Sequence, residues 1–312
     1  MSAGSVLVIK LGALGDFVQA LGPLAAIRAQ HPRDNIILLT TRPYVEFAEA
    51  SGYVNTVWLD SRPKLFEINK WRSLRRWLRR GKFRRIYDLQ TSDRSSFYFK
   101  LFYPDKPPAW SGIARGCSHP HDNPNRNAMH TIDRQREQLT KAGVRMAGFD
   151  DIANLDLSWA TADVEHLSVP ERFALLVPGG AQHRPAKRWP LENYKALAAQ
   201  LAERGVIPVL IGGPDEQATT HEIAAAVPSA LDLADKTDLL QLAELGRRAE
   251  VAIGNDTGPM HLIAAVGAPS VVLYSDESDP ALCGQRGKAV TIVRRPSLAE
   301  LSVEDVLGTL AI

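Results

Sequence analysis

The sequence lacks long apolar runs and contains very little cysteine. No apolar segment approaches the roughly 18 consecutive residues that a membrane-spanning helix needs. Cys117 and Cys283 are the only two cysteines among 312 residues, and they form no CxxC pair. This spacing excludes a disulfide-stabilised scaffold and is typical of a reducing cytoplasm. The first residues have neither the basic segment nor the apolar core of a signal peptide, so we expect none there.

The chain also lacks a strong excess of either charge. Its 37 Lys and Arg residues nearly balance 35 Asp and Glu residues, for a net charge of +2. The total charge therefore indicates no particular partner, and the distribution of charge is more informative. A hydrophobic fraction of 45% and this length are ordinary for a globular protein of two domains.

Short apolar runs alternate with helical patterns along both halves of the chain. Strands are expected in SVLVIK (5–10), NIILLT (35–40), TVWLD (56–60), RIYDLQ (85–90), FALLVPGG (173–180), VIPVLIGG (206–213), AEVAIGND (249–256) and PSVVLY (269–274). Such runs, separated by helices of 10–15 residues, predict βαβ units with parallel sheets. One of these helices is expected over residues 16–29.

A segment of weak periodicity, residues 148–170, separates the two series of strands. We therefore expect Rossmann-like domains over residues 1–150 and 171–312, joined by a linker over 151–170. Two such domains form a cleft, and open α/β sheets bind ligands beyond the carboxyl ends of their strands. The loops that follow the strands are thus the places to look for a site.

The loop after the first expected strand carries a lone acid. In VIKLGALGDFVQAL, Gly12 and Gly15 precede Asp16, which opens an apolar helical pattern. Asp16 is a preferred residue type for capping a helix, and it could equally be a catalytic carboxylate. The glycine spacing is not GxGxxG, which argues against a nicotinamide-dependent enzyme.

The late loop GNDTGPMHLIAAVGAP combines several phosphate-binding features. Asp256 and Thr257 are capping types, and Gly258 allows close backbone approach. The start of the following helix offers free N–H groups and partial positive charge, and His261 could add a ring N–H. The alternative is a well-capped helix with an ordinary buried histidine.

Two other loops offer polar groups after strands. In HRPAKRWP, Lys187 and Arg188 precede a helix that Pro190 is expected to start, and cations there favour a bound anion over a merely solvated loop. In GGPDEQ, Asp215 or Glu216 could accept hydrogen bonds from ribose hydroxyls or cap a helix.

A basic segment, NKWRSLRRWLRRGKFRR (69–85), forms an amphipathic helical pattern. Trp71, Leu74 and Leu78 recur at helical spacing, with Trp77 beside them. The pattern permits a solvated surface helix, nucleic-acid binding, or contact with an anionic membrane surface. Nothing else in the chain favours nucleic acid.

The polar segment ARGCSHPHDNPNRNAMH (114–130) raises the question of a metal site. Cys117, His119, His121 and His130 are metal-ligand types. The abundance of Pro and Asn is more typical of a mobile loop, so we expect no metal there.

Three motifs carry a resemblance to a known family: VLVIKLGALGD (6–16), PAKRWP (185–190) and NDTGPMHLIAAVGAP (255–269). They occur in the order found in glycosyltransferase family 9, the ADP-heptose:lipopolysaccharide heptosyltransferases, and DLQTSDRSSFYFKLF (88–102) is also similar. The resemblance covers most of the chain. It implies a GT-B fold, in which two Rossmann-like domains face across a cleft. It also implies an inverting transfer of heptose from ADP-heptose to the lipopolysaccharide inner core.

The resemblance implies roles for individual residues. Asp16 matches the family's catalytic base and Lys187 the lysine at the nucleotide diphosphate. The phosphate-binding helix start matches Asp256, Thr257, Gly258 and His261. Glu216 resembles the acid that holds the ribose.

The implied chemistry needs a base that removes the proton of the acceptor hydroxyl as this hydroxyl attacks the anomeric carbon, and positive charge at the departing diphosphate. Cations and a helix dipole can supply that charge, and no DxD pair stands at a strand end, so we expect a metal-independent enzyme without a cofactor. The resemblance also implies a lipid-linked, anionic saccharide acceptor at the inner face of the inner membrane. We expect the basic helix to contact this acceptor, the membrane surface, or both, through Arg75, Arg76, Arg79 and Arg80.

One departure from the family bears on the donor. SDESDP (275–280) has Ser275 in place of a usual glycine, and one apparent extra residue. Another nucleotide sugar, an epimerase, or a non-catalytic sugar-nucleotide-binding protein therefore remain alternatives.

Overall fold

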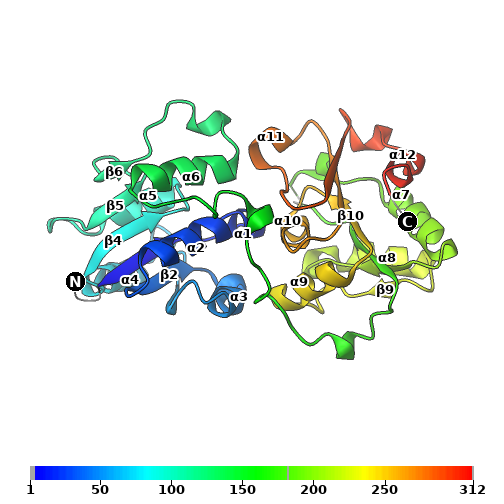
Figure 1. Ribbon diagram of the computed structural model, residues 1–312, viewed down its shortest axis with the longest axis horizontal. Coiled ribbons are helices and arrows are strands. Elements are labelled where there is room, and N and C mark those ends of the chain that lie inside the picture. The colour runs from blue at the N-terminus through cyan, green and yellow to red at the C-terminus, as the bar shows by residue number, and fades with distance from the viewer. Residues whose placement is uncertain (1–3, 181–182, 311–312) are drawn as a thin grey trace. The chain divides into compact units, whose positions relative to one another are not determined.

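The computed structural model describes residues 4–180 and 183–310, which form two compact units, Met1–Leu155 and Asp156–Ile312 (Figure 1). Each unit is an α/β structure with its own six-stranded parallel sheet, which confirms the predicted fold class.

In the first unit the sheet order is β3-β2-β1-β4-β5-β6. Its strands are β1 (Ser5–Ile9), β2 (Asn35–Thr40), β3 (Thr56–Leu59), β4 (Phe83–Asp88), β5 (Ala109–Gly112) and β6 (His119–Pro120). Its α-helices are α1 (Leu14–Val18), α2 (Leu21–Gln30), α3 (Val45–Ala50), α4 (Ile68–Arg80), α5 (Asp93–Lys100) and α6 (Thr131–Lys141).

In the second unit the order is β12-β11-β10-β7-β8-β9, which is the same topology. Its strands are β7 (Phe173–Val177), β8 (Ile207–Leu210), β9 (Leu231–Asp232), β10 (Val251–Asn255), β11 (Ser270–Tyr274) and β12 (Val290–Arg294). Its α-helices are α7 (Leu191–Glu203), α8 (Gln217–Ala226), α9 (Leu239–Arg248), α10 (Gly258–Ala265), α11 (Pro280–Cys283) and α12 (Val303–Leu307).

Both sheets reverse their strand order at one point, between β1 and β4 and between β7 and β10. Connections leave these neighbouring strands in opposite directions, and open α/β sheets bind ligands at such a reversal, beyond the carboxyl ends of the strands. The loops at residues 10–13 and 89–92 frame this point in the first unit. The segments 178–180, 183–190 and 256–257 frame it in the second.

The helix expected over residues 16–29 is two helices, α1 and α2. Pro23 explains the break. Its ring has no N–H to donate to the carbonyl of Gln19 and clashes with that carbonyl in a continuous helix. The prediction of one helix was therefore wrong.

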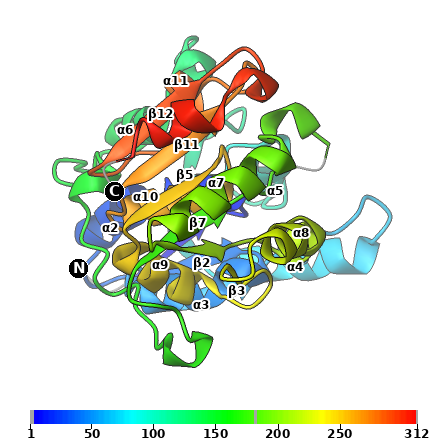
Figure 2. The same ribbon diagram turned by 90° about the vertical axis from the view of Figure 1, so that its right-hand side faces the viewer.

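Helices bury their apolar stripes on the sheets. In the second unit, Leu197 and Leu201 of α7 pack with Leu176 and Ile253 of the sheet, and α7 crosses one face of it (Figure 2). In the first unit, Leu74 and Leu78 of α4 are buried in the core. The apolar stripe of the basic helix is therefore a packing surface.

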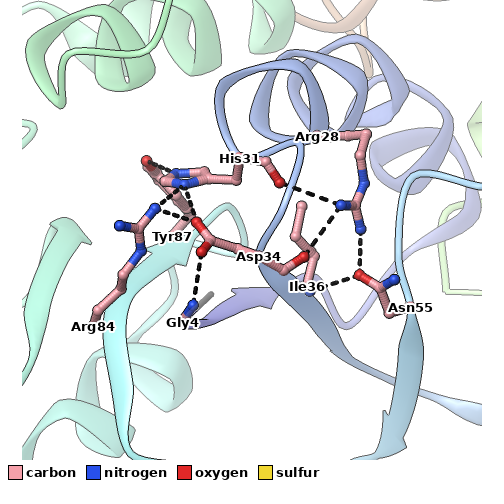
Figure 3. A network of polar contacts seen from close by, with 8 residues as sticks. All are labelled: Gly4, Arg28, His31, Asp34, Ile36, Asn55, Arg84 and Tyr87. Carbon is pink, nitrogen blue, oxygen red and sulfur yellow. Dashed lines mark hydrogen bonds and ion pairs between the residues drawn. The ribbon is translucent and has the colours of Figure 1, made fainter. Parts of the chain in front are cut away.

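A polar network closes the amino end of the first sheet, opposite its strand-following loops (Figure 3). Asp34 accepts from the Gly4 N–H (2.9 Å), lies 2.9 Å from His31 Nδ1, and pairs with Arg84. His31 Nε2 lies 2.9 Å from the Tyr87 hydroxyl. Burial opposes ionisation, but these hydrogen bonds and the Arg84 charge hold the pKa of Asp34 below its usual value. The network joins β1, α2 and β4 and serves the fold.

Within residues 4–180 and 183–310, no helix combines the length and the apolar character that crossing a membrane requires.

Candidate functional site

A buried amide organises the carboxyl end of the second sheet. Asn255, the last residue of β10, is completely buried. Its Nδ2 donates to the carbonyls of Pro178 and Gly179 (2.9 Å each), and its Oδ1 accepts from the Trp189 N–H (3.0 Å). One side chain thus fixes the loop after β7 and the segment that carries Lys187. The sequence analysis missed this role, although a polar residue closing a buried strand is a usable signal.

Lys187 and Asp256 form an ion pair at this point. Lys187 Nζ lies 2.7 Å from Asp256 Oδ2, and their side chains are only 13% and 9% exposed. The Ser278 hydroxyl donates to the same Oδ2 (2.5 Å), and the Tyr274 hydroxyl and Gln285 Nε2 lie 2.9 and 3.2 Å from Oδ1. Burial pulls the pKa of Asp256 upward, but these partners outweigh it and lower the pKa. The carboxylate therefore stays ionised and holds the ammonium in place.

Helix α10 begins beside this pair. Its N-cap residue is Thr257, Gly258 is its first residue, and His261 lies buried in its first turns. In the part of the chain that the structure describes, the Thr257 side chain makes no capping bond, and its buried Oγ1 has no hydrogen-bond partner. Asp256 contacts Lys187 instead of capping the helix. Neither the Thr257 nor the Asp256 side chain therefore caps α10.

Glu216 lies between the ends of two strands. It ends a short 3-10 helix, Pro214–Glu216, and its Oε2 accepts from the Gly213 N–H (3.0 Å). A Cβ added at Gly179 or Gly212 would come within 2.7 and 2.6 Å of Glu216 carbons. Glycine at both positions thus makes room for this side chain at the sheet edge. Asp215, the other sequence candidate, is exposed.

The segment that departs from the family pattern is built into the same site. Ser275 is buried, and Ser278 donates to Asp256. Arg184 donates to the Glu277 carbonyl, and Asp279 caps α11 through the Ala281 N–H (3.0 Å). The loop at 275–279 therefore supports the Lys187–Asp256 pair.

In the first unit, Asp16 lines a polar pocket of about 240 Å³. Asp16 is the third residue of α1 and half-buried, and the N-cap is Ala13. Asp16 is therefore not the residue that caps this helix. The other lining residues come from the segments after β1 and β4 and from the region of α6: Lys10, Leu89, Gln90, Thr91, Arg126, Asn127, Thr131, Arg134, Gln135 and Gln138.

Two buried ionisable groups, Lys10 and Asp88, belong to this region, and Lys10 lines the pocket. Lys10 Nζ donates to the Leu89 carbonyl (3.3 Å), and burial lowers its pKa, an effect that the nearby Asp16 carboxylate opposes. Asp88 accepts from the Gln90 and Thr91 N–H groups (3.1 and 3.0 Å). Burial nevertheless raises the pKa of Asp88 to about 6. Sequence reasoning missed Asp88, although an acid inside an apolar strand was visible.

The four arginines expected on the basic helix divide into two pairs. Arg75 donates to the carbonyls of Leu101 (3.0 Å) and Tyr103 (2.6 Å), and Arg79 pairs with Asp105. These two tie α4 to the end of α5. Arg76 and Arg80 are exposed, as is Arg72.

The Cys/His-rich segment does not gather its ligand-type side chains. The Cys117 thiol contacts the Gly112 carbonyl (3.8 Å), His130 Nδ1 accepts from the Ile132 N–H (3.2 Å), and His121 lies 3.4 Å from Glu137. Across residues 4–180 and 183–310, no three His, Cys, Asp or Glu side chains are grouped to hold a metal.

Comparison with known proteins places this site in context. The profile of glycosyltransferase family 9 (heptosyltransferase) matches residues 71–310. Lipooligosaccharide heptosyltransferase 2 of Haemophilus influenzae is 35% identical over 120 residues, which is 37% of this chain and 34% of the relative. The match thus spans about a third of that relative's length.

Two solved structures share the fold. Escherichia coli ADP-heptose lipopolysaccharide heptosyltransferase II has a TM-score of 0.77 at 23% identity, covering 97% of this chain and 96% of that one. An E. coli heptosyltransferase with ADP has a TM-score of 0.74 at 20% identity, covering 97% and 98%. These likenesses concern the fold alone.

Proposed function

Because the chain belongs to glycosyltransferase family 9, the heptosyltransferases, we propose that it is an inverting transferase. It moves heptose from ADP-heptose to an acceptor of the lipopolysaccharide core. The observation that carries this proposal is the Lys187–Asp256 pair beside the start of α10, at the strand-order reversal of the second sheet.

The C-terminal unit holds the nucleotide sugar. Lys187 and the N–H groups at the start of α10, with Gly258 first, bind the diphosphate. Thr257 offers a hydroxyl that has no hydrogen-bond partner among the described residues, and His261 lies in the same helix. Glu216 holds the ribose. Related heptosyltransferases with ADP or ADP-heptose in their names support this choice of donor.

The N-terminal unit holds the acceptor and the base. Asp16 takes the proton from an acceptor hydroxyl as its oxygen bonds to the anomeric carbon from the face opposite the diphosphate. The bond from that carbon to the diphosphate oxygen breaks, and the ADP that leaves is stabilised by Lys187 and the α10 dipole. Attack from the opposite face inverts the anomeric centre, and neither metal nor cofactor takes part.

The enzyme works in the cytoplasm, at the inner face of the inner membrane. The exposed Arg72, Arg76 and Arg80 of α4 suit an anionic surface. Just before them, Leu65 and Phe66 are 94% and 77% exposed. Basic residues next to exposed apolar ones are typical of peripheral membrane contact, and the acceptor is a lipid-linked anionic saccharide.

The test is turnover by the purified chain with ADP-, UDP- and GDP-linked sugars and a lipopolysaccharide-core acceptor, with and without EDTA. We expect heptose transfer from the ADP-linked donor, a product of inverted configuration, and full activity in EDTA. Preference for a UDP- or GDP-sugar, epimerisation, or ADP-heptose binding without transfer to any acceptor would each overturn the proposal. A strict Mg²⁺ requirement would overturn the metal-free scheme.

A further inference from the structure

The pocket beside Asp16 carries three cations against one carboxylate. Lys10, Arg126 and Arg134 line it together with Asp16. In the described part of the chain, none of the three cations forms an ion pair with a carboxylate. Arg136, two residues along α6, differs because it pairs with Asp133 at 3.4 Å. The pocket lining therefore carries more positive than negative side chains, with Asp16 as its one carboxylate.

The pocket also holds buried polar atoms that lack partners. Gln135 is 3% exposed, and both its amide nitrogen and its amide oxygen are buried without a hydrogen bond among the described residues. The same is true of Arg126 Nη2 and of Gln138 Oε1, although Gln138 Nε2 donates to the Asp88 carbonyl (2.8 Å). Leaving such groups unpaired costs free energy, so these atoms are poised for a ligand.

The lining defines the chemistry of that ligand. The guanidinium groups match the oxygens of a carboxylate or phosphate. The Gln135 amide can accept from a hydroxyl through its oxygen and donate to an acceptor through its nitrogen. A volume of about 240 Å³ lies below the roughly 300–1,000 Å³ of drug-sized sites and suits a single sugar.

We propose that Arg126, Arg134 and Gln135 bind a carboxylate or phosphate of the acceptor saccharide and thereby present its hydroxyl to Asp16. This anion site is distinct from the exposed arginines of α4. The assignment of the bound sugar as the acceptor rests on the proposed function, whereas the anion site itself does not.

The first experiment measures binding without turnover. The full chain is titrated with glucuronate, glucose 6-phosphate and glucose, and the arginine Nε–H signals are followed by NMR. We expect one or both anions to bind with millimolar affinity and glucose not to bind. The stronger anion identifies the group as carboxylate or phosphate. Equal binding of glucose, or no binding of either anion, would overturn the proposal.

Variants then locate the site. Arg134→Gln and Gln135→Leu should each weaken anion binding about tenfold or more, while Arg136→Gln, on the same helix, serves as the matched control and should not. Gln135→Leu should melt no lower than wild type, because the polar atoms it removes have no hydrogen-bond partner in the part of the chain that the structure describes. Wild-type affinity in both variants would place the anion elsewhere.

Turnover separates this inference from the proposed function. With an anionic acceptor, Arg126→Gln should raise the acceptor KM about tenfold or more and change kcat little, whereas Arg136→Gln should change neither. Anion binding without ADP-heptose turnover would overturn the proposed function and leave the anion site standing. Turnover with unchanged acceptor KM in Arg126→Gln and Arg134→Gln would overturn the anion site alone.

Discussion

Lys187 and Asp256 are 69 residues apart in the chain, and their charged groups lie 2.7 Å apart at the carboxyl end of the second sheet. Three further polar side chains converge on the carboxylate and none of them on the ammonium. Asp256 is thus fixed by its own neighbours, and Lys187 is positioned by Asp256. Within residues 4–180 and 183–310 the Lys187 ammonium has no other side-chain partner, so its remaining N–H bonds are available to an anion.

A double-mutant cycle of Lys187→Met and Asp256→Asn tests this relationship. Each single variant should lower the free energy of unfolding, because it leaves one largely buried charge without its partner, and the coupling should be about 1–3 kcal/mol. Lys195→Met is the matched control, since the partners of Lys195 are 80% and 58% exposed and exposed pairs contribute little.

The Lys187–Asp256 ion pair should also make the stability of the protein depend on pH in acid. Because the pKa of Asp256 is lowered by folding, its stabilisation is present above the unfolded pKa near 4 and is lost as the pH falls further. Lys187→Met should therefore lose less stability than wild type between pH 5 and 3.

Calorimetry should show weaker ADP binding by Lys187→Ala and His261→Ala, and unchanged affinity in both would move the donor site elsewhere.

Thr257→Val separates stability from binding. The Thr257 hydroxyl is buried and has no hydrogen-bond partner among the described residues, so replacing it with a methyl group should leave the melting temperature equal or higher. If the hydroxyl contacts the diphosphate, ADP affinity should fall about 5- to 10-fold, which corresponds to about 1 kcal/mol. Lower stability with unchanged ADP affinity would contradict both parts.

Asp16→Asn tests the base. The variant keeps the size of the side chain, and α1 does not depend on it for an N-cap, so folding should be unaffected. The transfer rate should fall about 10²-fold or more, which is the range for a lost general base. ADP affinity should stay within a few-fold of wild type, because the donor belongs to the other unit. Turnover at the wild-type rate would remove Asp16 from the chemistry.

Much of this fold follows from local pattern, and the exceptions have a common cause. Each predicted apolar run contains a strand, since buried parallel strands must be apolar on both faces. Four strands were missed: β5 (AWSG), β6 (HP), β9 (LD) and β12 (VTIVR). The first three are short and carry no such pattern, and β12 lies at the edge of its sheet, where only one of its five residues is buried. They form because a neighbouring strand offers hydrogen bonds, which is a property of the tertiary structure.

Some residues of the candidate site could likewise be predicted from the sequence, and others could not. Motif and position predicted Asp16, Lys187 and Thr257 as site residues, which remains a prediction, and each lies beside a strand-order reversal. Sequence reasoning did not identify Asn255 or Gln135. A polar residue at the end of a strand or inside a helix gains meaning only from what buries it, and burial depends on packing that no local pattern specifies.

Triple replacement of Arg72, Arg76 and Arg80 with Gln tests the basic face of α4. Binding to anionic vesicles should weaken and the KM for a lipid-linked acceptor should rise, both most clearly at low salt, while ADP affinity stays unchanged. Charge-matched replacement of Arg33, Arg204 and Arg248, which are also exposed, is the control and should retain vesicle binding. If both triple variants bind alike, α4 is only a solvated face.

Arg75 was also predicted to contact the acceptor or the membrane, but in the structure it holds α4 in place. Arg75→Gln removes hydrogen bonds to the carbonyls of Leu101 and Tyr103, so it should lower the melting temperature. Arg76→Gln should not. Equal melting temperatures for the two variants would show that these bonds do not anchor α4.

Asp88→Asn should change how stability depends on pH. Burial raises the pKa of Asp88 in the folded protein to about 6 from the ordinary aspartate value of 3.8, so the folded protein binds this proton more tightly than the unfolded chain does. The stability that Asp88 contributes is therefore present below about pH 4, declines as the pH rises to about 6, and is absent above, a difference of about 3 kcal/mol. Asparagine is neutral throughout and keeps an oxygen to accept from Gln90 and Thr91.

Urea unfolding from pH 4 to 8 should thus show the stability of Asp88→Asn rising relative to that of wild type as the pH rises, and matching or exceeding it at pH 8. The exposed Asp93→Asn serves as the control for loss of a carboxylate, and a constant difference between Asp88→Asn and wild type across this range would show that the carboxyl is ionised in both states.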